Sequence, residues 1–323
     1  MSPIFGYAGT YASPEAPGTY RFTLDADTGV LSDPQLIYRQ TNTKYSAWDK
    51  GLLATVTEAD GKSGLALLDA SVPGCPVLDS VLNEVTTACF LTWHDGLLYA
   101  ANYHDGHVLV YTPENGRLKL LHRIYVADEA GCHMALFHGR YLMVPCLCLD
   151  QIRIFDMEND YAPVGQLDFP KGTGPRHGVF TADHKTLYLV SETTNQLFTF
   201  AVDGLKFTQT SVISILPETD CAKPMAAAIR LSSDEATLYI SIRGASSITV
   251  LRTGEAKPRI LQHIDAEGVD PWDLQLVPGK HFLLASNRKS NEIVSFGLNA
   301  DGTVSGKISA IPVPQCVGLS LER

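Results

Sequence analysis

The chain has 323 residues, of which 45% are hydrophobic and 19% charged, a balance typical of globular proteins with a large core. Its net charge of −10 argues against an electrostatic nucleic-acid binder. No charged-then-apolar leader opens the chain and no run of 18 apolar residues predicts a membrane span. The seven cysteines are scattered, apart from Cys146 and Cys148, so we expect reduced thiols in a cytoplasmic protein.

Strand pairs joined by polar turns follow one another along the whole chain. In each pair an apolar strand ends at a polar or small residue and a turn follows. A second strand, in which apolar and polar residues alternate, then runs back beside the first, as in a β-hairpin. The first pair covers residues 7–24 with a long turn, and the second covers 52–68. Shorter pairs follow at 97–111, 141–155, 186–200, 237–251 and 282–296.

The pairs repeat at a regular interval. Just past each first strand lies one equivalent position, held in turn by Tyr11, Glu58, Tyr103, Leu147, Glu192, Arg243 and Arg288. The steps between these residues are 47, 45, 44, 45, 51 and 45, and a period of this length made only of strands is typical of a β-propeller with four strands per blade. We find no long run with helical periodicity, so we expect no helix of three or more turns.

Both ends of the chain are strand-like. Residues 3–11 and 313–321 would each leave an unpaired sheet edge unless they met. We therefore predict one all-β domain over residues 1–323, a seven-bladed β-propeller whose two termini close one blade.

A second equivalent position lies ahead of each first strand. From the third pair onward it holds Phe90, His133, His177, Ala228, Asp273 and Val317, and the residue before it is Cys89, Cys132, Arg176, Ala227, Trp272 or Cys316. In a radial fold both positions point to one central face. Taken singly, a histidine or arginine there is as well explained by a structural hydrogen bond or ion pair, but the convergence of several favours a site.

Several motifs in these strands carry a resemblance to a known family. They are Gly-Thr-Tyr near the N-terminus, the hairpin 97–111, Gly-Pro-Arg-His at 174–177 with Ser-Glu at 191–192, and the histidine within 131–136. Together they resemble the lactonase-type seven-bladed β-propellers, which include propeller-type 6-phosphogluconolactonases and carboxymuconate-lactonising enzymes. The resemblance runs through essentially the whole chain.

The resemblance implies a hydrolase acting on a small anionic sugar lactone, with 6-phosphogluconolactone of the pentose phosphate pathway as the favoured substrate. His133, Arg176, Glu192 and Arg243 occupy the family's functional positions and are the predicted catalytic residues. Lactone hydrolysis requires a base for water and a stabilised oxyanion. A neutral histidine suits the first task and arginines suit the second, while the glutamate would orient them or move the proton itself.

Four further residues are predicted to bind substrate. Neighbours in a strand point to opposite faces, so we expect Arg176 to contact the ligand and His177 to support it from behind. Tyr103, Arg288 and Glu58 share the central register and are expected at the rim. No metal-binding motif is present, so no metal and no cofactor is expected.

Three alternatives remain at the level of sequence. The same residues would serve a cycloisomerase that forms a lactone from a carboxylate substrate. The fold also serves as a non-catalytic binding scaffold. Cys132, beside His133, is an alternative nucleophile. No nucleic-acid or membrane partner is indicated, and the sequence does not indicate an oligomeric state.

Overall fold

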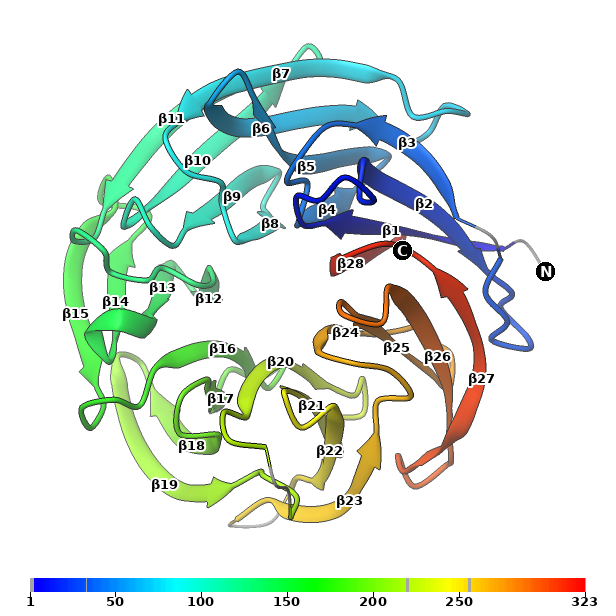
Figure 1. The fold of residues 1–323 in the computed structure, drawn as a ribbon. Coiled ribbons are helices and arrows are strands. Elements are labelled where there is room, and N and C mark those ends of the chain that lie inside the picture. The colour runs from blue at the N-terminus through cyan, green and yellow to red at the C-terminus, as the bar shows by residue number, and fades with distance from the viewer. Residues whose placement is uncertain (1–2, 33, 219–220, 255–256, 323) are drawn as a thin grey trace.

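A ring of seven antiparallel sheets, each of four strands, makes up the protein (Figure 1). The computed structural model describes residues 3–32, 34–218, 221–254 and 257–322. Within these segments the one helical element is a 3₁₀ turn at Leu147–Leu149 (η1), and no helix is long and apolar enough to cross a membrane. The predicted all-β, seven-bladed propeller without long helices is therefore confirmed for the described chain.

We number the sheets as blades 1 to 7 around the ring. Blade 1 contains β28 (Cys316–Leu321), β1 (Ile4–Thr10), β2 (Gly18–Leu24) and β3 (Gln35–Arg39). Blade 2 contains β4 (Ser46–Asp49), β5 (Leu52–Ala59), β6 (Lys62–Asp69) and β7 (Val77–Glu84). Blade 3 contains β8 (Phe90–His94), β9 (Leu97–Asn102), β10 (His107–Glu114) and β11 (Arg117–Tyr125).

The other four blades repeat this order. Blade 4 contains β12 (Leu136–His138), β13 (Tyr141–Cys146), β14 (Gln151–Asp156) and β15 (Ala162–Asp168). Blade 5 contains β16 (Pro175–Phe180), β17 (Thr186–Ser191), β18 (Gln196–Asp203) and β19 (Lys206–Ser214). Blade 6 contains β20 (Met225–Leu231), β21 (Thr237–Arg243), β22 (Ser247–Arg252) and β23 (Arg259–Asp265). Blade 7 contains β24 (Pro271–Leu276), β25 (Phe282–Asn287), β26 (Glu292–Leu298) and β27 (Val304–Pro312).

Blade 1 is built from both ends of the chain, as predicted. The C-terminal strand β28 forms its inner edge and pairs antiparallel with β1, with Gly6 opposite Leu321 and Ala8 opposite Leu319. The Tyr7 hydroxyl donates a hydrogen bond of 2.5 Å to Glu322 Oε1 and adds a side-chain link between the termini. This pairing completes the fourth strand of blade 1 and closes the ring.

Apolar side chains between neighbouring blades hold the ring together. Leu65, Val108 and Leu142, one each from blades 2, 3 and 4, are fully buried in one cluster. Burying such a side chain stabilises the fold by about 1.5–3 kcal/mol. With this packing between blades, the inner strands of the seven blades are arranged around a common axis (Figure 1).

Two glycines of blade 1 allow the segment before β4 to lie close to the axis. A Cβ atom at Gly9 would stand 2.2 Å from Thr43 O, and one at Gly318 would stand 2.7 Å from the Tyr45 ring. Gly318 N also donates a hydrogen bond of 3.0 Å to Lys44 O. The backbone of residues 43–45 is therefore held between β1 and β28, which fixes where the side chain of Lys44 starts.

Candidate active site

One mouth of the ring contains a cavity of about 170 Å³ to which every blade contributes at least one residue. Because all seven blades reach it, the cavity lies over the central axis. Its lining consists of Tyr11, Lys44, Cys89, Tyr103, His104, His133, Glu192, Arg243, Trp272 and Val317. The predicted convergence of the two strand-end positions on one central face is thus seen directly.

The carboxylate of Glu192 is the centre of this site. Its Oε2 atom lies 2.8 Å from Arg176 Nε and 2.7 Å from Arg243 Nη2. The same oxygen lies 4.0 Å from His133 Nε2. The four residues predicted as catalytic therefore meet around one oxygen atom, although blades 5 and 6 and the loop before β12 supply them.

Arg176 lies behind Glu192 and does not line the cavity. Its side chain is almost fully buried, and Nη1 donates a hydrogen bond of 2.6 Å to Ala227 O in blade 6. All of its observed contacts are thus with protein groups. We expected Arg176 to touch the ligand, but this geometry assigns it to holding Glu192.

The expectation that Arg176 and His177 point to opposite faces is wrong. The pairing of β16 with β17 shifts register between Pro175 and His177, which leaves Arg176 as the extra residue of a β-bulge. Both side chains are buried near the axis, and Arg176 Nη1 lies 3.3 Å from His177 Nδ1. The His177 ring also stands edge-on to the His133 ring, 5.1 Å away. His177 therefore supports both Arg176 and His133 from below the cavity.

Arg243 presents a donor that the protein does not use. Its Nε atom is buried and has no hydrogen-bond acceptor among the described residues, while Nη2 pairs with Glu192 Oε2 at 2.7 Å. The guanidinium lies over the Trp272 ring, 4.3 Å from its centroid. Buried donors in native proteins are nearly always paired, so Nε is suited to an oxygen of a ligand in the cavity.

His133 is a neutral base. Burial lowers the pKa of its imidazole well below the usual value, and the nearby charges of Arg176, Arg243 and Lys44 lower the pKa further. The ring contacts the Tyr103 ring edge-on at 5.7 Å, and Nδ1 lies 3.9 Å from Cys89 Sγ. At neutral pH the imidazole is therefore free of a proton on one nitrogen and able to accept one.

The predicted substrate-binding residues at the rim fall into two groups. Tyr103 lines the cavity, and its hydroxyl lies 3.1 Å from Cys148 Sγ. Glu58 and Arg288 do not line it. The carboxylate of Glu58 accepts a hydrogen bond of 2.8 Å from Asn42 Nδ2, and Arg288 Nε lies 3.3 Å from Asp270 Oδ2. Arg288 still borders the site, because its guanidinium lies 4.6 Å from the Trp272 ring centroid.

Besides His104, the lining residue that our sequence analysis missed is Lys44. It lies 45 residues before Cys89 and so holds the same ring position, one blade earlier than the series began. Cys132, the alternative nucleophile, occupies that position in blade 4 and is fully buried. A hydrogen bond with Cys146, together with burial, raises the pKa of the Cys132 thiol, which disfavours the reactive thiolate.

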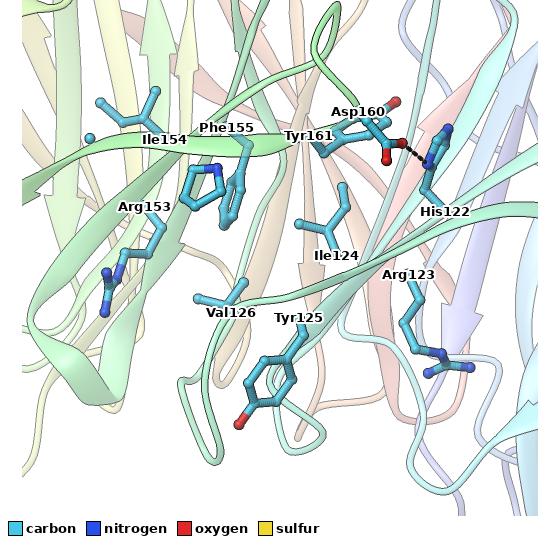
Figure 2. A pocket seen from close by; sticks show the side chains of 12 residues that line it. His122, Arg123, Ile124, Tyr125, Val126, Arg153, Ile154, Phe155, Asp160 and Tyr161 are labelled. Atoms are coloured by element: carbon cyan, nitrogen blue, oxygen red, sulfur yellow. Dashed lines mark ion pairs between the residues drawn. The ribbon is translucent and has the colours of Figure 1, made fainter.

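Other hollows lie away from the axis. A groove of about 370 Å³ runs between the outer strands β11 and β15, with Ile124 on one side and Phe155 on the other (Figure 2). Its one ion pair joins His122 Nδ1 and Asp160 Oδ1 at 3.2 Å. This groove is open and involves only blades 3 and 4, so the convergence seen over the axis has no counterpart there.

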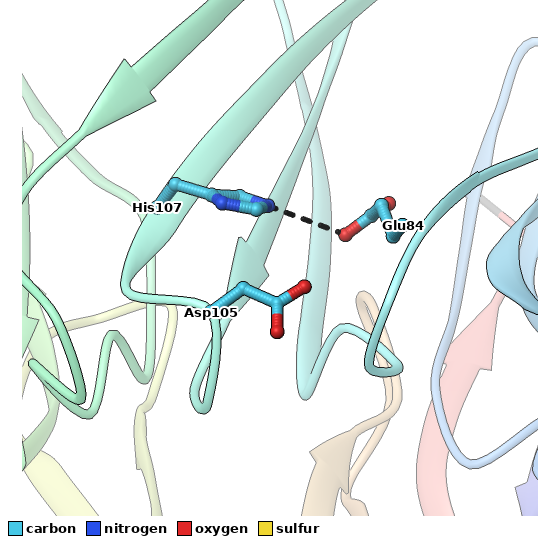
Figure 3. A group of neighbouring side chains, drawn as sticks. All are labelled: Glu84, Asp105 and His107. Atoms are coloured by element: carbon cyan, nitrogen blue, oxygen red, sulfur yellow. Dashed lines mark ion pairs between the residues drawn. The ribbon is translucent and has the colours of Figure 1, made fainter.

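A cluster of Glu84, Asp105 and His107 has side chains close enough to suggest a metal site (Figure 3). Protein groups already surround it. Asn102 Nδ2 donates to Glu84 Oε2 at 2.8 Å and to Asp105 Oδ2 at 3.3 Å. Arg123 Nη1 lies 3.2 Å from His107 Nε2, and its positive charge would repel a metal cation. We therefore interpret the cluster as a link between β7 and the β9–β10 turn.

Comparisons with known proteins agree with the propeller fold. The sequence model of the family described as "Lactonase, 7-bladed beta-propeller" matches residues 5–320. A 6-phosphogluconolactonase of Bacillus subtilis is 26% identical over 98% of each chain. A solved structure of a protein from Lactobacillus plantarum covers 100% of both chains with a TM-score of 0.91 and 26% identity. The periplasmic gluconolactonase of Pseudomonas aeruginosa has a TM-score of 0.87 at 21% identity, over 100% of this chain and 99% of its own.

Proposed function

The chain belongs to the lactonase family of seven-bladed β-propellers, and we propose that it hydrolyses a sugar lactone, with 6-phosphogluconolactone as the favoured substrate. One observation carries this proposal. Neutral His133 and Arg243, whose Nε has no partner among the described residues, line the same cavity, on either side of Glu192. A base for water and donors for an oxyanion are the two groups that lactone hydrolysis requires.

The attacking water would be held between His133 and Glu192. The 4.0 Å gap between His133 Nε2 and Glu192 Oε2 is too long for a direct hydrogen bond, and a water molecule beside both atoms would bond to each. His133 would take one proton as the water oxygen attacks the lactone carbonyl carbon. Glu192 would keep the other proton directed away, so that a lone pair faces the substrate.

The oxyanion formed by this attack would be stabilised by Arg243. Its Nε atom would donate to the former carbonyl oxygen, in a site where burial strengthens the interaction. When the intermediate collapses, the bond from the carbonyl carbon to the ring oxygen breaks. The ring oxygen then receives the proton from His133, which yields a hydroxy acid and restores the neutral imidazole.

Arg176 is a positioning residue in this scheme. Its hydrogen bonds to Glu192 and to Ala227 O leave it no exposed face for substrate. Lys44, Arg176 and Arg243 lie in the cavity wall or behind it with the one anion Glu192, while Arg288 at the border is paired with Asp270. The local charge is therefore opposite to the −10 of the whole chain and favours an anionic substrate.

A hydrolysis assay on freshly prepared 6-phosphogluconolactone, corrected for spontaneous ring opening, tests the proposal. We expect saturable turnover by the wild-type protein, with none in the Arg243→Met variant at equal concentration. Wild-type protein that leaves the ring-opening rate unchanged for 6-phosphogluconolactone and for neutral δ-gluconolactone would refute the proposal.

A further inference from the structure

Lys44 stands out among the cations of the site because it has no counter-charge. The side chain lies in the cavity wall and is only 8% exposed. Among the described residues, no carboxylate comes within 4.0 Å of its ammonium group. Its one ring contact is with Tyr11, whose centroid lies 5.4 Å from Nζ. A buried ammonium without an anion is costly, so its retention in a cavity wall calls for an explanation.

Arg176 provides a direct comparison, because it holds the same ring position three blades further on. There the cation forms an ion pair with Glu192 at 2.8 Å. The carboxylate that acts on Lys44 is that of Glu58, which already accepts a hydrogen bond from Asn42. Burial consequently lowers the pKa of Lys44, and Glu58 offsets this only in part. An anion bound in the cavity would supply the missing charge.

The position of Lys44 relative to the reacting groups is also informative. Lys44 belongs to blade 2, while Glu192 and Arg243 come from blades 5 and 6. Both are three blades away from blade 2, which is the greatest separation in a ring of seven. A ligand whose carbonyl lies beside Arg243 would therefore direct its far end toward Lys44 and Tyr11.

We propose that Lys44 binds the anionic substituent of the substrate, at the end remote from the lactone carbonyl, and so makes the enzyme selective for acidic over neutral lactones. This inference rests on the proposed lactonase activity. It replaces our expectation that one of the two arginines holds the phosphate, since Arg176 is enclosed by protein groups and Arg243 faces the reacting carbonyl. The substituent is a phosphate or a carboxylate, which share the same recognition by an ammonium group.

The test compares Lys44→Met with Lys44→Arg on two substrates, 6-phosphogluconolactone and δ-gluconolactone. Methionine keeps the length of the apolar stem and removes the charge. We expect Lys44→Met to raise KM for the phosphorylated lactone about 10- to 100-fold, the range for a hydrogen bond to a charged group. The loss of kcat/KM for the neutral lactone should be much smaller, so that the preference for the phosphorylated lactone falls, and Lys44→Arg should retain most of the selectivity. A glucuronic acid lactone in place of the phosphorylated one distinguishes carboxylate from phosphate recognition.

Lys50→Met is the matched control. Lys44 precedes strand β4, whereas Lys50 follows it at the opposite mouth of the ring and is exposed. Lys50→Met should change neither KM. An equal loss on both substrates, or none on either, in Lys44→Met would overturn the inference. Melting temperature adds a second readout: removing an unpaired buried charge should leave Lys44→Met as stable as the wild type or more so, and a large loss would indicate a structural role.

The experiment also separates this inference from the proposed activity. If the wild-type protein hydrolyses neither lactone, calorimetric titration with 6-phosphogluconate still measures anion binding. Weaker binding by Lys44→Met than by the wild type and Lys50→Met would then support the role of Lys44 in a non-hydrolytic protein. Unchanged binding would refute it.

Discussion

His133 Nε2 lies 4.0 Å from Glu192 Oε2 across the boundary between blades 4 and 5. At this separation the two groups do not bond directly, yet both can contact one water molecule. The imidazole has no carboxylate bonded to its other nitrogen, since Nδ1 faces Cys89 Sγ at 3.9 Å. The arrangement thus differs from a catalytic triad, in which an acid orients the base.

The first prediction concerns this base. His133→Gln keeps a polar side chain of similar size and removes the proton acceptor. We expect kcat to fall about 10²–10⁴-fold with little change in KM, because a positioned general base contributes that much to the chemical step. Steady-state kinetics on folded protein measures the effect. The control is His138→Gln, at the C-terminal end of β12 and outside the cavity lining. Full activity in a folded His133→Gln variant would move the base to Glu192.

The second prediction concerns pH. Burial and the neighbouring cations hold the pKa of His133 well below its usual value, so the acid limb of kcat/KM should fall clearly below the reference pKa of about 6.5. A pH–rate profile from pH 8 to 5 would measure it. An acid limb centred at or above pH 6.5 would contradict the assignment of the buried imidazole as the base.

The same groups predict how stability depends on pH. His133 and His177 both have pKa values lowered mainly by burial, so below pH 6.5 the unfolded chain takes up protons that the folded protein does not. The free energy of unfolding should therefore decrease as pH falls from about 6.5, by up to about 1.4 kcal/mol per pH unit for each histidine. Urea unfolding at several pH values measures the slope, and replacing both histidines by glutamine should flatten it.

The third prediction concerns the charge balance around Glu192. Glu192→Gln leaves the guanidinium groups of Arg176 and Arg243 buried near one another without an anion. We expect the free energy of unfolding to fall by about 3–5 kcal/mol, the cost of breaking a buried ion pair. Adding Arg176→Met should restore part of the loss, because it removes one unpaired charge. Denaturant unfolding of the single and double variants tests this, and equal stability of Glu192→Gln and wild type would refute it.

The ring register explains how much of the site the sequence could predict. Tyr103, Glu192 and Arg243 were placed by a period of about 45 residues, and all three line the cavity. Period alone does not say whether a side chain at the right position is free to bind. Glu58 and Arg288 share the register but lie beside Asn42 and Asp270, which are partners that only the folded chain reveals.

Local irregularity accounts for what was mispredicted. Alternation along a strand assumes a regular ladder, and the bulge at Arg176 depends on how β16 pairs with β17. The position of Lys44 at the central face could have been predicted from the sequence, because Lys44 lies one repeat of 45 residues before Cys89. Its burial could not, since that follows from Gly9 and Gly318, which let blade 1 close over the segment before β4.

The last prediction concerns Trp272, which lies 4.3 Å from the Arg243 guanidinium and 4.6 Å from that of Arg288, measured to the ring centroid. Glu192 holds Nη2 of Arg243 at 2.7 Å, and the indole face is the contact that supports the plane of the guanidinium. A cation–π contact contributes about 0.5–2 kcal/mol. Trp272→Leu should therefore lower kcat/KM about 2- to 30-fold, while Trp272→Phe, which keeps an aromatic face, should lose less. Trp93→Leu, at the other mouth of the ring, controls for the loss of an indole. Equal activity of Trp272→Leu and wild type would show that Glu192 alone orients Arg243.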